Sequence, residues 1–304
     1  MKIEDIADII HFRYSKNYLK WEYPKNVNKN LLLKYPKIFK YFDSVIMKNE
    51  IIGNYALDFN SNNNKNILCK AEGLNCLVEK LKPDAKKNIL IVAGGDSKLS
   101  QNIKSIEKII FNFNEIYYEA KDINFKNIKA IPMGLIFAYT LRNGGNDVIL
   151  DIINRNNLPK KKLITTAFGN QWSNLNKTIK ERNDLINFCE NNSWVSKNMW
   201  NPIMYYDKLS EYKYFICPLG NGIQAPKIYE CLLVQTIPVC IKGPAFEDLK
   251  EYGFPILLIN NFNELNPTML NYKYKNEFKD VNWEKVKYNL TIEGFAKKFK
   301  LKNF

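Results

Sequence analysis

Residues 214–243 read YFICPLGNGIQAPKIYECLLVQTIPVCIKG, and this stretch decides the fold that the sequence predicts. It opens with an apolar run, Tyr214–Cys217, that has the length and composition of a buried strand. Gly220 and Gly222 then mark a turn, which we expect to use positive backbone φ angles. A helix that begins with proline follows, and a second apolar run, Ile237–Ile241, comes after it. The order strand, turn, helix, strand is typical of a crossover between parallel strands.

The turn leads into the start of a helix, where free backbone N–H groups and the helix dipole favour an anion. Lys227 adds a positive charge in the first turn of this helix, and Glu230 lies on the same helix face. A cation for phosphate and a carboxylate for ribose hydroxyls together suit a nucleotide diphosphate. From the pattern alone, a simple tight turn followed by a surface ion pair explains the same residues equally well.

The stretch resembles the donor-binding signature of exostosin-like glycosyltransferases and their small bacterial and viral relatives. That signature joins an apolar strand, Pro-x-Gly, Asn-Gly-Ile-Asp, an Arg, a Glu-Ala pair and Gly-x-Ile-Pro-Val. The matching positions here are Pro218, Gly220, Asn221, Gly222, Ile223, Glu230, Ile237, Pro238 and Val239. The chain departs from the signature at Gln224, where the family has an acidic residue, and at Lys227, where it has Arg. Further departures are Cys231 for Ala and Thr236 beside the last strand.

The resemblance implies the GT-B architecture, an α/β fold in which two Rossmann-like domains with parallel sheets face a central cleft. Strands and helices alternate in both halves of the chain, which agrees with this architecture. We expect an N-terminal acceptor-side domain over residues 1–150 and a C-terminal nucleotide-sugar-binding domain over residues 151–280. The segment 281–304 contains a closing helix, predicted over Trp283–Phe299. In folds of this type such a helix often crosses back to the first domain.

The resemblance also implies roles in donor binding. Family relatives carry a glycine after the first strand of the second domain and an Arg in the helix that follows, which are Gly169 and Arg182 here. Taken alone, Arg182 is also explained as a solvated helix residue. The expected donor-binding residues are Gly169, Asn170, Arg182, Gly220, Asn221, Gly222, Lys227 and Glu230.

Transfer with inversion of stereochemistry requires a general base from the first domain. Asp96 is the first candidate because it follows a predicted strand, Asn88–Ala93, and two glycines. Glu119, at the end of the next predicted strand, is the second candidate, and Glu72 is the third. Each of these residues is also explained as a cap, a turn residue or a surface charge. The usual retaining GT-B pattern has a Glu where this chain has Gly222, which favours inversion.

Cysteine spacing and short motifs argue against a bound metal. The six cysteines include no close pair with zinc spacing, and the sequence offers no Asp-x-Asp. We therefore expect neither a metal nor any other cofactor. Free thiols and a start without the features of a signal peptide favour a cytoplasmic protein. No apolar run reaches the ~18 residues that a membrane span requires.

The formal net charge of +14 implies an anionic partner. Lysines are spread along the chain, which argues against a dedicated nucleic-acid tail, and an AT-rich genome would raise lysine content without any function. We expect a nucleotide-diphosphate sugar as donor and a glycan, lipid-linked or protein hydroxyl as acceptor. Lysines on the closing helix are also compatible with peripheral contact with a membrane.

Two other classes of protein remain open from the sequence. One is a non-catalytic basic protein on the same fold, which binds nucleic acid or another polyanion. The other is a dinucleotide enzyme, but Ala93–Asp96 lacks the third glycine of the G-x-G-x-x-G turn that such an enzyme uses.

Overall fold

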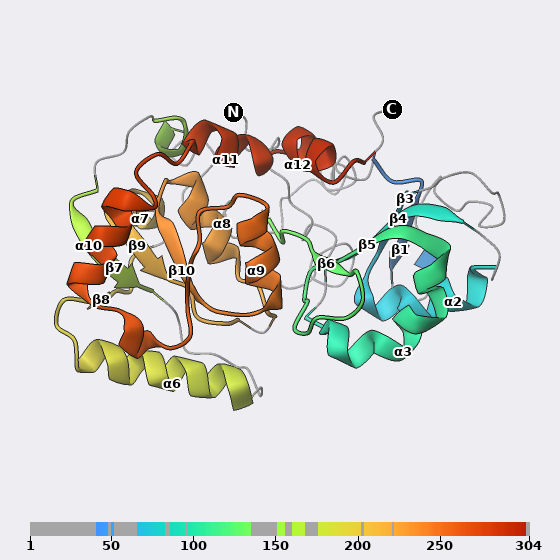
Figure 1. Ribbon diagram of the computed structural model, residues 1–304, viewed down its shortest axis with the longest axis horizontal. Helices are drawn as coiled ribbons and strands as arrows, with labels where there is room; N and C mark the ends of the chain where they lie inside the picture. Colours follow the sequence, from blue (N-terminus) through green and yellow to red (C-terminus); the bar gives the residue numbers. More distant parts are fainter. Residues whose placement is uncertain are drawn as a thin grey trace, which may run out of the picture.

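The computed structural model describes residues 41–47, 50–51, 66–82, 86–94, 96–134, 151–155, 160–167, 176–201, 204–220 and 222–301. These residues form two α/β units, each built around a mainly parallel sheet (Figure 1). This is the α/β class with two Rossmann-like units that the sequence predicts for a GT-B protein.

The N-terminal unit contains a six-stranded sheet in the order β2-β1-β3-β4-β5-β6. Its strands are β1 (Ser44–Met47), β2 (Glu50–Ile51), β3 (Asn66–Cys69), β4 (Lys87–Val92), β5 (Phe113–Tyr118) and β6 (Lys129–Ala130). Only β2, at one edge, pairs antiparallel with its neighbour. One face of the sheet packs against α2 (Leu74–Lys80) and α3 (Leu99–Ile109). Short 3-10 segments, η6 (Ala71–Gly73) and η7 (Ile110–Asn112), flank these helices.

The C-terminal unit contains a five-stranded parallel sheet in the order β11-β10-β9-β7-β8. Its strands are β7 (Lys162–Thr166), β8 (Ser196–Lys197), β9 (Tyr212–Ile216), β10 (Ile237–Ile241) and β11 (Leu257–Ile259). On one face lie α6 (Asn176–Glu190), η9 (Phe262–Glu264) and α10 (Pro267–Asn276). On the other lie α7 (Tyr205–Ser210), α8 (Pro226–Leu233) and α9 (Pro244–Glu251).

The central strands of this sheet are apolar on both faces because helices cover both. In β9, Tyr214 and Ile216 pack in the cluster under α6 and α10, whereas Phe215 packs in the cluster under α7, α8 and α9. Such strands appear in the sequence as continuous apolar runs. The predicted crossover is confirmed, because β9, α8 and β10 follow one another and the two strands pair in parallel.

The closing segment forms two helices rather than the one predicted. Helix α11 (Trp283–Asn289) and helix α12 (Ile292–Lys298) are separated at Leu290 and Thr291. Thr291 is extended and its hydroxyl accepts a hydrogen bond from the Gly294 N–H at 3.0 Å, so it caps the second helix and ends the first.

The two closing helices pack on different units (Figure 1). Val286 of α11 lies in the cluster beneath α8, whereas Phe295 and Phe299 pack with Leu68 and Ile91 on the open face of the N-terminal sheet. Helix α12 thus covers the face that α2 and α3 leave free.

The two units also meet where α9 lies against β6, the edge strand of the N-terminal sheet (Figure 1). The Asp248 carboxylate of α9 accepts hydrogen bonds from the Ala130 N–H at 2.5 Å and from the Lys121 ammonium at 2.7 Å. The Tyr252 hydroxyl donates to the Ala130 carbonyl at 3.0 Å. Side chains of one unit therefore satisfy the edge backbone of the other.

Candidate functional site

The turn between β9 and α8, residues 217–225, lies at the topological switch point of the C-terminal sheet; we call it the β9–α8 turn. From β7 the chain passes through α6 to β8, which lies next to β7 on one edge. The chain later returns as β9, which lies next to β7 on its other edge. β7 and β9 are therefore parallel neighbours whose following connections, through α6 and α8, leave toward opposite faces of the sheet. Open parallel sheets bind ligands in the crevice at such a point.

Helix α8 begins at Pro226, as the sequence predicts, and its N-cap residue Ala225 is extended and provides no side-chain cap. The expectation of a positive φ is wrong for Gly220, whose φ lies outside the left-handed region. A Cβ atom on Gly220 would meet nothing nearer than the Gly222 carbonyl oxygen at 3.9 Å. The geometry of the turn therefore does not require glycine at position 220. Asn221 lies outside the described residues.

Lys227 reaches from α8 across the switch point to the end of β7. Its ammonium donates to the Ala167 carbonyl and lies 5.5 Å above the Tyr205 ring and 5.6 Å above the Phe215 ring. Burial lowers the pKa of Lys227, and the carboxylate of Glu230 opposes this effect. The structure thus holds a cation in place beside the β9–α8 turn.

Glu230 lies one helical turn beyond Lys227 and is buried, with 6% of its surface exposed. Burial raises the pKa of Glu230, while the Lys227 ammonium and the Tyr205 hydroxyl oppose that rise. The interpretation of Lys227 and Glu230 as a surface ion pair is therefore wrong.

Arg182 approaches the same turn from α6, on the opposite face of the sheet. Its Nε and Nη2 atoms donate to the Leu219 carbonyl at 3.2 and 3.1 Å. The carboxylate of Glu181, the preceding residue, accepts from the Leu219 N–H at 2.9 Å. Arg182 is thus partly buried and bonded to the turn rather than fully solvated, and burial lowers its pKa.

Both cations lie beside the β9–α8 turn. Burial is the main cause of the lowered pKa of Lys227, and the charge of Arg182 adds a small contribution in the same direction. Two partly buried cations beside one turn and one helix start form a place where an anion is favoured. Gly169 and Asn170, the remaining expected donor-binding residues, lie outside the described residues.

Gln224 has a role that sequence reasoning did not find. Its amide nitrogen donates to the carbonyls of Glu119 and Ile131 at 2.7 and 2.8 Å. Its amide oxygen accepts from the Met133 N–H at 3.0 Å and from the Tyr229 hydroxyl. All three backbone groups belong to the N-terminal unit, so Gln224 joins the β9–α8 turn to the other domain. A carboxylate has no hydrogen to donate, which explains why the acidic residue of the signature does not fit here.

The candidate general bases lie in the N-terminal unit. Asp96 is exposed in the turn between β4 and α3. Glu119 follows β5, is only 2% exposed, and accepts a hydrogen bond from the Gly94 N–H at 2.5 Å. Glu72 is exposed in η6, with its carboxylate 3.7 Å from the ammonium of Lys70. Of the three, Asp96 is the exposed carboxylate at the carboxyl end of a central strand.

Within the described part of the chain, no three His, Cys, Asp or Glu side chains are grouped to hold a metal ion. None of the helices in that part is both long enough and apolar enough to cross a bilayer.

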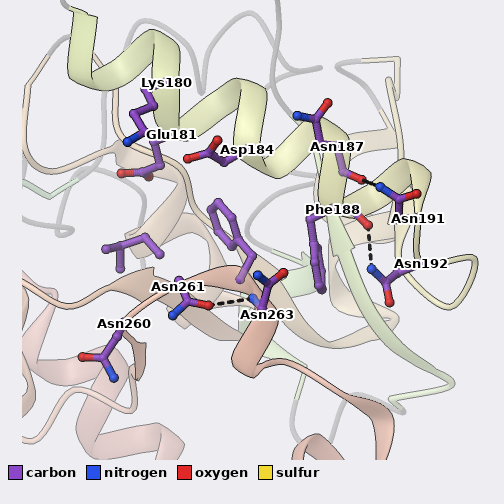
Figure 2. A pocket seen from close by; sticks show the side chains of 12 residues that line it. Lys180, Glu181, Asp184, Asn187, Phe188, Asn191, Asn192, Asn260, Asn261 and Asn263 are labelled. Atoms are coloured by element: carbon purple, nitrogen blue, oxygen red, sulfur yellow. Dashed lines mark hydrogen bonds between the residues drawn. The ribbon is translucent and has the colours of Figure 1, made fainter.

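A cavity of about 640 Å³ lies on the α6 face of the C-terminal unit, between α6 and the residues that follow β11 (Figure 2). We call it the α6 cavity. Glu181 lines this cavity and also binds the Leu219 N–H, so one side chain touches both the cavity and the β9–α8 turn.

Neither family models nor curated proteins match the chain. Among solved structures, an alpha,alpha-trehalose-phosphate synthase (UDP-forming) from Burkholderia vietnamiensis is similar over 77% of this chain and 74% of its own, with 9% identity and a TM-score of 0.37. A trehalose-6-phosphate structure from E. coli, bound with UDP-2-fluoro glucose, is similar over 79% and 74%, with 7% identity and a TM-score of 0.41. TarM is similar over 77% of this chain and 54% of its own, with 12% identity and a TM-score of 0.37. These likenesses are too remote to assign a function, so the function is inferred from the geometry of the site.

Proposed function

We propose that the protein is a glycosyltransferase that moves a sugar from a nucleotide-diphosphate donor to a hydroxyl of a glycan, lipid-linked or protein acceptor. One observation carries this proposal. Arg182 and Lys227 come from opposite faces of the C-terminal sheet to the same turn at its switch point, and the buried Glu230 carboxylate lies one helical turn beyond.

The proposed donor lies with its diphosphate at the two cations. As the bond from the sugar to the diphosphate breaks, negative charge grows on the leaving oxygen, and fixed cations stabilise that charge. Lys227 is already held by the Ala167 carbonyl and two aromatic rings, so little reorganisation is needed. The two cations take the charge-neutralising role that a divalent metal has in other transferases, and we therefore propose transfer without a metal.

Glu230 is proposed to accept hydrogen bonds from the ribose hydroxyls. A buried carboxylate that accepts from neutral hydroxyls forms charge-assisted bonds, which are stronger than bonds between neutral groups. Glu230 lies on the same helix face as Lys227, which supports a ribose position next to the diphosphate.

We propose an inverting displacement with Asp96 as the general base. The acceptor oxygen attacks the anomeric carbon while the carboxylate of Asp96 takes the acceptor proton, and the diphosphate leaves with the bonding electron pair. Asp96 is preferred to Glu119 because Asp96 is exposed whereas Glu119 is buried.

Thermal unfolding with UDP, GDP, CDP and ADP, each with and without EDTA, tests the donor site. A ligand at a hundred times its dissociation constant adds ~2.7 kcal/mol of stability and so raises the unfolding temperature. For a chain of 304 residues this corresponds to about 4 °C. We expect one diphosphate to give such a shift and EDTA to leave it unchanged.

Variants locate the binding of that diphosphate. Lys227→Ala and Glu230→Gln should lose the shift, whereas Lys242→Ala, which removes an exposed cation of the same unit, should keep it. If no nucleoside diphosphate changes the unfolding temperature of the folded protein, the proposal is wrong. Salt-dependent binding of DNA of any sequence would then support a non-catalytic polyanion-binding protein instead.

A further inference from the structure

The α6 cavity is an elongated groove. One wall runs along α6 from Lys180 to Phe188 and continues to Asn191 and Asn192, and the other is formed by residues 260–263 after β11 (Figure 2). Because a helix rises 1.5 Å per residue, the part of α6 that lines the cavity is about 12 Å long. The groove is therefore suited to a chain-like ligand rather than to a compact one.

Amide side chains dominate the walls of the α6 cavity. Six of the twelve lining residues are asparagines: Asn187, Asn191, Asn192, Asn260, Asn261 and Asn263. An amide offers two donor hydrogens and an acceptor oxygen, which matches the mixed donor and acceptor character of a hydroxyl. Asn191 and Asn192 use donors on carbonyls of α6 at 2.9 Å. Within the described residues, the side chains of Asn187 and Asn263, on opposite walls, have no hydrogen-bond partner.

The floor of the cavity is apolar. The rings of Phe188 and Phe262 are each 6% exposed, with centroids 6.0 Å apart, and Ile241 lies at the end of β10. Polar walls above an apolar floor suit a molecule with hydroxyl edges and C–H faces. The charges on the walls are those of Lys180, Glu181 and Asp184, one cation against two carboxylates, so a second phosphate group is not favoured there.

From these features we infer that the α6 cavity binds a neutral oligosaccharide. Asn187 and Asn263 bind hydroxyls from opposite walls, Asp184 accepts from a further hydroxyl, and the C–H faces of the sugars lie toward the apolar floor. The inference that the cavity binds an oligosaccharide depends only on the residues that line it. Glu181 links the cavity to the β9–α8 turn, so the cavity could hold a glycan acceptor near the donor, and this use of it rests on the proposed function.

Titration calorimetry with maltohexaose, cellohexaose and chitohexaose tests the inference. We expect at least one of these hexasaccharides to bind with a measurable Kd. The double variant Asn187→Ala/Asn263→Ala should weaken that binding at least tenfold. The matched control is Asn183→Ala, which removes an exposed amide of α6 that does not line the cavity and should leave the Kd unchanged.

Two outcomes would overturn the inference. In one, none of the three hexasaccharides binds to the folded wild-type protein. In the other, the double variant, with an unchanged unfolding temperature, binds as well as the wild type. The two sites can be tested separately. Lys227→Ala should keep hexasaccharide binding, and the double variant should keep the stabilisation by a nucleoside diphosphate, so failure of the proposed function can be told apart from failure of this inference.

Discussion

The turns that end two central strands, one in each unit, are held in different ways. The β4–α3 turn, residues 93–98, is fixed by its own unit: the Glu119 carboxylate accepts from the Gly94 N–H, and the Tyr118 hydroxyl donates to the Ser97 carbonyl at 3.1 Å. The β9–α8 turn is held by its own unit, through Glu181 and Arg182 of α6, and also by the other unit, through Gln224. The first turn presents an exposed carboxylate and the second lies beside two cations, so we propose that the first serves the chemistry and the second serves binding.

A glutamine lies at each turn: Gln101 just after the β4–α3 turn and Gln224 within the β9–α8 turn. The side chain of the first acts as a hydrogen-bond acceptor, and the side chain of the second acts as a donor. The Gln101 side chain, in the first turn of α3, accepts a hydrogen bond from the Lys98 N–H at 2.9 Å and is exposed. Gln224 is buried and donates to two carbonyls of the other unit. A glutamate carboxylate can replace the accepting amide oxygen of Gln101, but it cannot replace the donating amide nitrogen of Gln224.

Gln224→Glu should give the largest effect. The variant loses two donors and places a buried charge against the carbonyls of Glu119 and Ile131, which should cost roughly 3–5 kcal/mol of the free energy of unfolding. Denaturant titration measures this loss. Gln101→Glu is the matched control and should change stability by less than about 0.5 kcal/mol, because a carboxylate still accepts and favours a helix start. Equal losses of unfolding free energy in the two variants would show that Gln224 is not needed as a hydrogen-bond donor.

Asp96→Asn separates chemistry from binding. If Asp96 is the general base, kcat should fall by about 100-fold or more, while stabilisation by the nucleoside diphosphate stays unchanged. Product formation with excess donor gives kcat, and thermal unfolding reports donor binding. A variant that keeps full kcat would remove Asp96 from the proposed mechanism.

Alanine at the glycines compares the two turn backbones. Gly94 has a φ of 77°, so Gly94→Ala places a side chain in the left-handed region and should cost about 1–2 kcal/mol. Gly220 has neither a positive φ nor a close neighbour, so Gly220→Ala should be neutral or should stabilise the protein by up to about 1 kcal/mol. Thermal unfolding compares the pair, and the reverse order of stabilities would contradict the structure.

The smallest expected effect is a pH dependence of donor binding. Burial lowers the pKa of Lys227, so its ammonium loses a proton at lower pH than an ordinary lysine does. An anion favours the charged form, so affinity should fall as pH rises through the pKa of the free protein, by at most about tenfold per pH unit. Calorimetry with the stabilising diphosphate measures this fall. Lys227→Arg should flatten the profile, because arginine keeps its charge.

Much of the C-terminal unit could be predicted because its strands are buried on both faces. The sequence therefore shows uninterrupted apolar runs at β9 and β10, and Pro226 marks the helix start between them. Strand β3 was missed because it begins with Asn66, a polar residue that is fully buried and hydrogen-bonded to Tyr41 and Asn88. The break between α11 and α12 was missed because Thr291 fits a helical pattern until its capping role is seen.

Some features of the candidate site could likewise be predicted from the sequence, and others could not. The identities and spacing of Lys227 and Glu230 can be read locally, since both lie on one helix. Their burial cannot, because it depends on Tyr205 and on strands far along the chain. The role of Gln224 depends on Met133, which is 91 positions away, so no local pattern reveals it.

Helix α12 has a consequence for how the protein is made on the ribosome. Synthesis runs from the N-terminus, so the strands of the first sheet emerge early, but the face that holds Leu68 and Ile91 is covered by Phe295 and Phe299. That face therefore lacks the cover of Phe295 and Phe299 until helix α12 has been translated. The N-terminal unit, although it is synthesised before the C-terminal unit, is thus completed after it, and in the interval its apolar face is exposed to aggregation.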